Sequence, residues 1–168
     1  MKGKRASLPS PSSSLMCQRK YDVFLNFKGE DICNTFMDHL YETLQQNDII
    51  TFRDKEGLER GESITYELFK VIEESEFAII ILSKNYASSM WCLDELAKII
   101  KCNKEMRLKV VLIFYNVDPS DVRKQTGTFE QAFIDYQIYF EDNIKRVETW
   151  RATLREVANI SGWKLQNR

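Results

Sequence analysis

Apolar runs of strand length alternate with helical patterns, and this alternation most constrains how the chain can fold. The runs "FAIIILS" (77–83) and "LKVVLIFYNV" (108–117) contain few polar residues. Such runs are typical of strands inside a parallel sheet that is covered on both faces. Shorter strand patterns occur at "YDVFLNF" (21–27), "IITFRD" (49–54) and "WKL" (163–165). The sequence therefore predicts five strands.

Amphipathic helical patterns lie between these strands. Ile32, Phe36, Leu40 and Leu44 recur every four residues, which places them on one helical face. Further apolar stripes predict helices over 65–75, from the "WCLDEL" block to about residue 104, over 128–140 and over 143–162. The segments 55–64 and 118–127 are polar and contain glycine or proline, so we expect them to be loops.

This order of elements predicts an α/β fold with a flavodoxin-like, doubly wound, five-stranded parallel sheet flanked by helices. In that architecture strands 1 and 3 are neighbours, and ligands bind beyond the carboxyl ends of the strands at this switch point. The fold therefore brings "KGED" (28–31) close to "NYASSMWCLDEL" (85–96). We expect one domain over 20–168, preceded by a tail over 1–19.

The tail has a distinctive composition. Residues 1–20 contain no acidic side chain and are rich in Ser, Pro, Lys and Arg. A signal peptide needs an apolar middle, which this segment lacks, and a plastid transit peptide is usually longer. We therefore predict a disordered tail. Lys2 follows the first methionine, and N-myristoylation requires glycine at that position, so we expect no such anchor.

Composition and charge argue against several classes of protein. The formal net charge of −1 favours neither nucleic acid nor an anionic membrane surface. No apolar run approaches the roughly 20 residues of a membrane span. The 4 cysteines form no C-x-x-C pair and His39 is the single histidine, so we expect no metal site and reduced thiols in the cytosol.

Common catalytic and nucleotide-binding motifs are also missing. No G-x-G-x-x-G or Walker-type glycine run occurs, which argues against a Rossmann dehydrogenase or a P-loop nucleotidase. A hydrolytic triad would have to use His39, and no strained G-x-S-x-G nucleophile turn is present. Phe27 and Ser83 stand where a receiver domain would carry its acidic residues, so that class fits poorly.

The two adjacent acids in "WCLDEL" are candidates for chemistry. At about 100° per residue, Leu93, Leu96, Ala97 and Ile100 form the core face of the helix. Glu95 then lies roughly 150° from the centre of that face, on the same side as Trp91 one turn earlier. We expect Glu95 and Trp91 to face a cleft and Asp94 to interact with the helix dipole, capped by Ser88 or Ser89. On this pattern alone, ordinary helix electrostatics explains both acids more simply.

The segment "KGED" has two interpretations. Gly29 allows a turn, and Glu30 and Asp31 are favourable charges at the start of a helix. Alternatively, Lys28 and the free backbone N–H groups of a helix N-terminus hold a phosphate. Neither pattern decides between them.

Four blocks, taken together, resemble one family. They are "YDVFLNFKGED", "TFRDKEGLERGESI", "AIIILSKNYASSMWCLDEL" and "VLIFYNVDPSDVRKQTGTF". In this order they are similar to the characteristic blocks of plant Toll/interleukin-1 receptor (TIR) domains, the N-terminal modules of nucleotide-binding leucine-rich-repeat immune receptors. The resemblance covers about residues 20–165.

The resemblance implies the flavodoxin-like fold and an activity. Self-associated plant TIR domains cleave NAD+ at the nicotinamide–ribose bond, so NAD+, or alternatively NADP+, is a substrate and no cofactor or metal is expected. The implied catalytic residue is Glu95, and the implied substrate-binding residues are Lys28, Gly29, Glu30, Asp31 and Trp91. A loop with Gly57, Leu58 and Gly61 is expected near a neighbouring subunit's active site. Asp38 and His39 on the first helix, together with the last helix, resemble the self-association surface.

The implied chemistry suits a single glutamate. Loss of nicotinamide leaves positive charge on the ribose, and a fixed carboxylate in a water-poor site stabilises that charge strongly. The leaving group already carries a positive charge, so no general acid is needed. The expected setting is plant immune signalling in the cytoplasm, with the nucleus as a second location.

Three departures from the family pattern keep a second hypothesis open. Lys28 stands where the family usually has Arg, Ile32 and Cys33 replace Thr-Arg, and Asp38 replaces a Ser. Cys33 removes a charge, and Asp38 adds one at the expected pairing surface. The alternative is therefore a non-catalytic TIR interaction module that pairs with other TIR domains.

Overall fold

The sheet has the predicted order of strands. The computed structural model describes residues 19–53 and 62–166. Its five parallel strands follow the order β2-β1-β3-β4-β5, so the predicted flavodoxin-like sheet is confirmed, with strands 1 and 3 as neighbours. The strands are β1 (Tyr21–Asn26), β2 (Thr51–Arg53), β3 (Ser75–Leu82), β4 (Lys109–Tyr115) and β5 (Trp163–Leu165).

Helices connect the strands and account for most of the predicted helical stripes. The α-helices are α2 (Asn34–Gln46), α3 (Glu62–Glu73), α4 (Met90–Glu105), α5 (Pro119–Lys124), α6 (Glu130–Tyr139) and α7 (Ile144–Ala158). Short 3-10 turns are η1 (Gly29–Asp31), η2 (Tyr86–Ser88), η3 (Gly127–Phe129) and η4 (Glu141–Asn143). Within residues 19–53 and 62–166, no helix is long and apolar enough to span a membrane.

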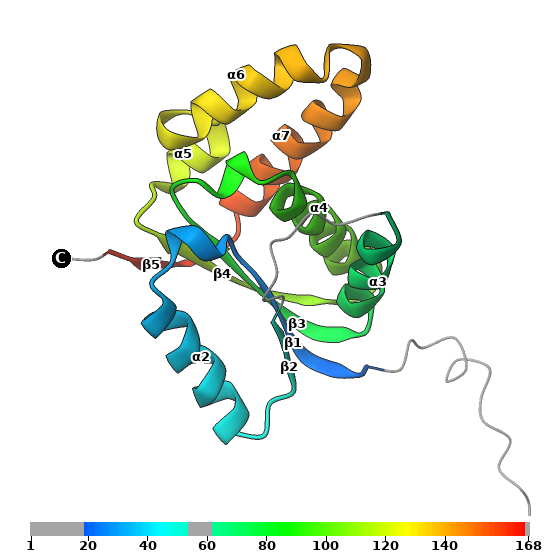
Figure 1. Cartoon of the computed structure of the whole chain (residues 1–168), viewed down its shortest axis with the longest axis vertical. Coiled ribbons are helices and arrows are strands. Elements are labelled where there is room, and N and C mark those ends of the chain that lie inside the picture. Colours follow the sequence, from blue (N-terminus) through cyan, green and yellow to red (C-terminus); the bar gives the residue numbers. More distant parts are fainter. Residues whose placement is uncertain (1–18, 54–61, 167–168) are drawn as a thin grey trace, which may run out of the picture.

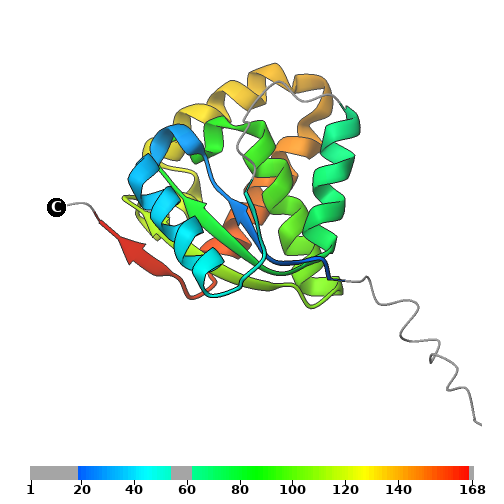
Figure 2. The same ribbon diagram turned by 60° about the horizontal axis from the view of Figure 1, so that its bottom comes forward.

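Two apolar cores lie on opposite faces of the sheet. Figures 1 and 2 show α2 on one face and α3, α4 and α7 on the other. The larger core joins Phe24 and Ile80 of the sheet to Leu96 of α4 and Trp150 of α7. The smaller core packs Met37 of α2 against alternate residues of the same strands. Alternation along each strand thus buries both faces, as the continuous apolar runs predict.

The prediction of a loop over 118–127 is wrong. Residues Pro119–Lys124 form α5, whose Val122 is fully buried. Asp118 is its N-cap and accepts a hydrogen bond from the backbone N–H of Ser120 at 2.8 Å. Gln125 then ends the helix in the left-handed conformation at φ 52°. An N-cap acid followed by proline at the first helical position is a helix-start signal, and it outweighed the polar composition.

The end of the predicted loop over 55–64 also needs correction. Residues 54–61 lie outside the described residues, and α3 already begins at Glu62. The predicted tail over 1–19 lies outside them too, except for Arg19. The guanidinium of Arg19 pairs with the Glu76 carboxylate at 3.3 Å.

Candidate active site

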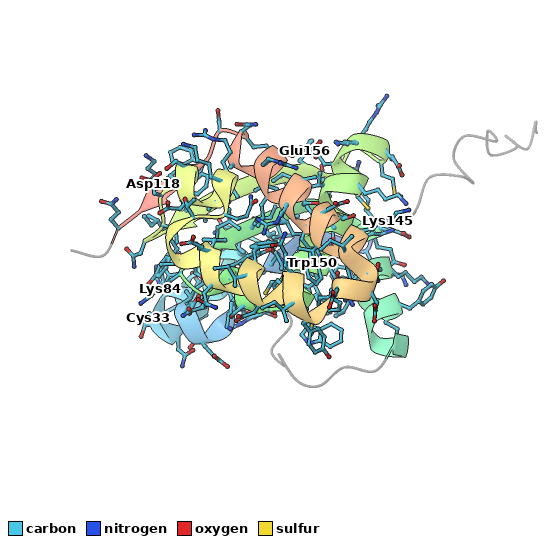
Figure 3. All side chains as sticks on the ribbon, turned by 90° about the horizontal axis from the view of Figure 1, so that it is seen from above. Cys33, Lys84, Asp118, Lys145, Trp150 and Glu156 are labelled. Atoms are coloured by element: carbon cyan, nitrogen blue, oxygen red, sulfur yellow. The ribbon has the colours of Figure 1, made fainter. Side chains whose placement is uncertain are left out.

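The carboxyl ends of β1 and β3 meet, and Asp31 ties together the segments that follow them. Its carboxylate accepts hydrogen bonds from Ser83 Oγ at 2.7 Å, from the backbone N–H of Asn85 at 2.6 Å and from Asn85 Nδ2 at 2.9 Å. The predicted proximity of residues 28–31 to the segment after β3 is therefore confirmed. In Figure 3 the labelled Cys33, two residues after Asp31, and Lys84, between Ser83 and Asn85, lie at the same edge of the molecule.

Lys28 contacts the same segment. Its Nζ donates to Ser88 Oγ at 2.6 Å, and Ser88 Oγ donates in turn to the backbone carbonyl of Asn85. Gly29 and Glu30 are exposed in η1. Lys28 thus fastens η2 to the loop after β1, while phosphate binding by this residue stays a prediction.

Glu95 of α4 is buried beside the last residue of β1. Ser89 caps α4 by accepting a hydrogen bond from the backbone N–H of Cys92, as predicted for one of two serines. One helical turn later, Glu95 is only 8% exposed, and its Oε2 accepts from Asn26 Nδ2 at 2.9 Å. Asn26 is the last residue of β1 and is fully buried.

The predicted orientation of Glu95 away from the core is therefore wrong. Helix α4 contacts β1, β4, η2, α3 and α7, so its buried surface extends far beyond one stripe. It includes Cys92, Leu93, Glu95, Leu96, Ile99, Ile100 and Cys102. Trp91 is half-buried in the first turn of the same helix.

A buried polar network surrounds this carboxylate. The Tyr86 hydroxyl donates to Asn26 Oδ1 and also lies 3.0 Å from the backbone oxygen of Cys92. Burial raises the pKa of Tyr86 well above its usual value, and the Cys92 and Glu95 charges add to this. Tyr86 therefore stays a protonated donor. Sequence reasoning missed Asn26 and Tyr86, although a polar residue ending the buried run of β1 was a signal for the first.

Asp94 has a different role from its neighbour. The predicted first-turn dipole role is wrong, since the first turn of α4 carries no acid. Its Oδ2 accepts from Arg146 Nη2 at 2.8 Å and its Oδ1 from Trp150 Nε1 at 2.9 Å. Arg146 also lies over the Phe140 and Trp150 rings, 5.1 and 5.0 Å from their centroids. Asp94 thus fastens α4 to α7, whose Trp150 is labelled in Figure 3.

The remaining predicted residues lie elsewhere. Asp38 and His39 are exposed on α2, on the other face of the sheet from α4. Asp38 Oδ1 accepts from Arg53 Nη1 at 2.9 Å, so its charge is paired within the chain. Gly57, Leu58 and Gly61 lie outside the described residues.

Cys33 is exposed at the N-cap of α2. A hydrogen bond from the Thr35 side chain, followed by those from the backbone N–H groups of Phe36 and Thr35, lowers the pKa of its thiol. Within 19–53 and 62–166, no group of three His, Cys, Asp or Glu side chains is placed to hold a metal ion.

A groove of about 820 Å³ lies on the outer side of α4, away from the end of β1. Lys98, Lys101 and Lys104 line it from α4, and Thr149 and Glu156 line it from α7. Asp94 reaches its wall, whereas Glu95 does not. The two adjacent acids therefore border different parts of the molecule.

Comparison with known proteins extends the resemblance found in the sequence. The family model described as TIR domain matches residues 20–168. Disease resistance protein RPV1 of Vitis rotundifolia is 52% identical over 161 residues, covering 96% of this chain and 11% of that protein. TMV resistance protein N of Nicotiana glutinosa is 48% identical over 151 residues, covering 90% and 13%. The chain thus spans about an eighth of the length of these relatives.

A solved structure is similar over most of the chain. It is titled "Structure of the activated Roq1 resistosome directly recognizing the pathogen effector XopQ (TIR domains)". The two chains superpose with a TM-score of 0.78 at 50% identity, over 86% of this chain and 87% of that one.

Proposed function

Because the chain belongs to the TIR domain family, we propose that it is a self-associating NAD+ glycohydrolase that signals in plant innate immunity and cell death. The immune role is supported by its similarity to plant disease resistance proteins. The reaction proposed is hydrolysis of the nicotinamide–ribose bond of NAD+, with NADP+ as an alternative substrate. The cytoplasm is the proposed location, with the nucleus as a second.

The observation that carries this proposal is the buried carboxylate of Glu95 where β1 ends. Glu95 is 8% exposed, and its carboxylate accepts a hydrogen bond from the Asn26 amide. The carboxylate therefore keeps a fixed direction, and burial keeps most water away from it. Departure of nicotinamide leaves positive charge on the ribose, and a preorganised carboxylate stabilises this developing charge. Nicotinamide leaves as a neutral molecule because its ring nitrogen is already cationic in NAD+. The proposed site therefore needs no general acid.

The residues around Glu95 have proposed roles in holding the substrate. Trp91 offers an aromatic face one turn before Glu95, and Lys28 offers a cation on the neighbouring segment. Backbone groups of Gly29, Glu30 and Asp31 complete the proposed substrate-binding segment. The loop with Gly57, Leu58 and Gly61 is proposed to reach a neighbouring subunit's active site.

Self-association is the proposed condition for activity. The similar Roq1 TIR domains come from a structure titled as an activated resistosome, which supports an assembled state for this chain. Asp38 and His39 on the exposed side of α2 are the proposed pairing residues. Other TIR domains are proposed partners through the same surface, and neither nucleic acid nor a membrane is proposed as one.

A second candidate is a non-catalytic TIR interaction module. The observation that favours it is Cys33, an exposed thiol where the family usually carries an arginine. If a cation at this position helps to hold the substrate or a neighbour, then its loss removes activity while the pairing surface of α2 remains.

One experiment separates the two candidates. Wild-type protein and Glu95→Ala are clustered on a multivalent scaffold and incubated with NAD+, and consumption is followed by mass spectrometry. The proposed function predicts turnover that depends on clustering and disappears in Glu95→Ala. No turnover by clustered wild-type protein, together with intact pairing, supports the interaction module. Equal turnover by Glu95→Ala contradicts the proposed role of this carboxylate.

A further inference from the structure

We infer that Asn26, held in place by Tyr86, helps to orient the Glu95 carboxylate. The contact itself is independent of any reaction, while its consequence for turnover rests on the proposed function. Asn26 is a positioning residue in this scheme, because it acts on the substrate only through Glu95.

The first support is the position of Asn26. It ends β1, pairs in register with Ile80 of β3, and has no solvent exposure. A buried side-chain amide needs hydrogen-bond partners at both ends, since an unsatisfied polar group inside a protein is costly. Asn26 meets this need with two side chains: its nitrogen donates to Glu95 and its oxygen accepts from Tyr86.

The second support is that the amide has one favourable orientation when Glu95 is ionised, as the proposed function requires. An ionised carboxylate only accepts hydrogen bonds, so the amide nitrogen of Asn26 has to face Glu95. The amide oxygen then faces Tyr86, whose hydroxyl is fully buried and positioned as a donor. Reversing the amide would place its oxygen against the carboxylate, and the Tyr86 hydroxyl would lose its acceptor in Asn26. Tyr86 therefore fixes Asn26, and Asn26 fixes Glu95.

The third support is that all three hydrogen-bonded residues belong to elements of regular secondary structure. Asn26 is part of the sheet, Glu95 lies within α4, and Tyr86 begins η2. The backbone oxygen of Cys92, one turn before Glu95, also lies 3.0 Å from the Tyr86 hydroxyl. The contacts thus join β1, η2 and α4, and packing limits the movement of all three side chains.

Three charged side chains in this region, Lys28, Asp31 and Asp94, have hydrogen-bond partners of their own. Lys28 donates to Ser88, and Asp31 accepts from Ser83 and Asn85. Asp94, adjacent to Glu95 in sequence, accepts from Arg146 and Trp150 instead. The titratable side chains that interact electrostatically with Tyr86 are Cys92 and Glu95. A substitution at Asn26 therefore acts on Glu95 without removing any of these other contacts.

The first test measures Glu95 without any substrate. The carboxyl ¹³C resonance of Glu95 is titrated with pH in wild-type protein and in Asn26→Asp, and Glu95→Gln assigns the signal. Asn26→Asp conserves shape but replaces the donor with a second carboxylate beside Glu95. Two carboxylates that share a site resist ionising together, so the apparent midpoint of the Glu95 signal is expected to rise by about one pH unit or more. An unchanged midpoint in folded Asn26→Asp overturns the inference.

A matched control uses the same substitution on the same helix as Glu95. Asn103 Nδ2 donates to the backbone oxygen of Leu108 at 2.7 Å, near the far end of α4. Asn103→Asp also removes an amide hydrogen bond and adds the same charge, at an exposed position distant from Glu95. It is expected to leave the midpoint of the Glu95 signal unchanged. A similar rise in Asn103→Asp would show that the effect is not specific to Asn26, and would overturn the inference.

A second variant tests the inference if Asn26→Asp does not fold. Tyr86→Phe removes only the hydroxyl, so the Asn26 amide is no longer fixed. In wild-type protein the chemical shifts of the Asn26 side-chain NH₂ group are expected to change as Glu95 titrates. In Tyr86→Phe this change in chemical shift is expected to be at least about threefold smaller. Tyr136→Phe is the control, because Tyr136 donates to Ala87 and not to Asn26. Full coupling in Tyr86→Phe overturns the inference.

Kinetics on the clustered protein then separate positioning from substrate binding. A hydrogen bond to a charged group corresponds to roughly a 10- to 100-fold change in rate when it acts in the transition state. We expect Asn26→Asp to lower kcat by about this factor, with little change in KM and with a shifted pH profile. If wild-type protein releases no nicotinamide, the proposed function fails, and the two NMR titrations still decide the role of Asn26.

Discussion

Asp31 and Asn85 are joined twice across the carboxyl ends of β1 and β3. The Asn85 backbone N–H donates to one carboxylate oxygen of Asp31 at 2.6 Å, and its side-chain amide donates to the other at 2.9 Å. Sheet topology brings the two segments together, and this pair holds them there. The same carboxylate also accepts from Ser83, so one acid organises the loop that borders the candidate site.

Replacing Asp31 is expected to loosen this junction. Asp31→Ala leaves three donors without their acceptor, and hydrogen bonds to charged groups contribute about 1.5–3 kcal/mol each before neighbouring groups compensate. We expect the free energy of unfolding to fall by about 2–4 kcal/mol in urea denaturation. Glu30→Ala, at an exposed neighbouring acid, is expected to change it by less than about 0.5 kcal/mol. Equal effects of the two substitutions would contradict this account of Asp31.

The contacts of Asp94 with α7 predict different losses of stability for two substitutions of this residue. Asp94→Ala leaves the nearly buried Trp150 indole without its acceptor and breaks the Arg146 pair. We expect it to destabilise the fold by about 2–4 kcal/mol. Asp94→Asn keeps an oxygen that accepts from Trp150, so its cost is expected to be about 1 kcal/mol. Thermal and urea unfolding of both variants measure this order, and a reversed order would contradict it.

Much of the fold follows from the sequence because its signals are local. Continuous apolar runs and four-residue stripes reveal strands and helices, and chain order then dictates the sheet and its switch point. The proximity of Asp31 to Ser83 and Asn85 follows from that topology alone. The helix at Pro119–Lys124 was missed because composition was given more weight than its capping signal.

The surroundings of Glu95 did not follow from the sequence. A helical wheel gives angles around one helix but not the number of elements packed against it, and α4 is enclosed on several sides. One partner of Glu95 is Asn26, 69 residues away in sequence, and one partner of Asp94 is Trp150, 56 residues away. Only the folded chain reveals that one acid fastens two helices while the other is held at the end of β1.

The pairing surface gives a prediction about charge. Asp38, which adds a carboxylate relative to the family pattern, forms an ion pair with Arg53, and the Arg53 side chain is 15% exposed. The charge of this carboxylate is therefore already paired within the chain. We therefore expect Asp38→Ser to change the dissociation constant of self-association by less than about threefold, since exposed ion pairs contribute little. His39→Ala, which removes a ring from the same surface, is expected to weaken association about tenfold. Sedimentation velocity measures both, and a tenfold strengthening in Asp38→Ser would show that the carboxylate repels a partner.

The thiols are expected to differ in reactivity. Hydrogen bonds lower the pKa of exposed Cys33 below its ordinary 9.0, whereas burial raises the pKa of Cys102. Because the thiolate is the nucleophile, Cys33 should be alkylated at lower pH and much faster than Cys102. Mass spectrometry after timed iodoacetamide treatment of Cys17→Ser protein measures both rates. The ranking is wrong if Cys102 reacts first in the folded protein.

The most direct measurement of the central claim compares two isosteric substitutions at adjacent positions. Nicotinamide release from NAD+ is followed by chromatography for clustered wild-type protein, Glu95→Gln and Asp94→Asn. We predict that Glu95→Gln, which keeps an oxygen to accept from Asn26 but loses the charge, releases nicotinamide at least about 100-fold more slowly than wild-type protein. Asp94→Asn is predicted to stay within about threefold of wild type, because this acid contacts α7. Wild-type rates in Glu95→Gln, or equal losses in both variants, would contradict the account.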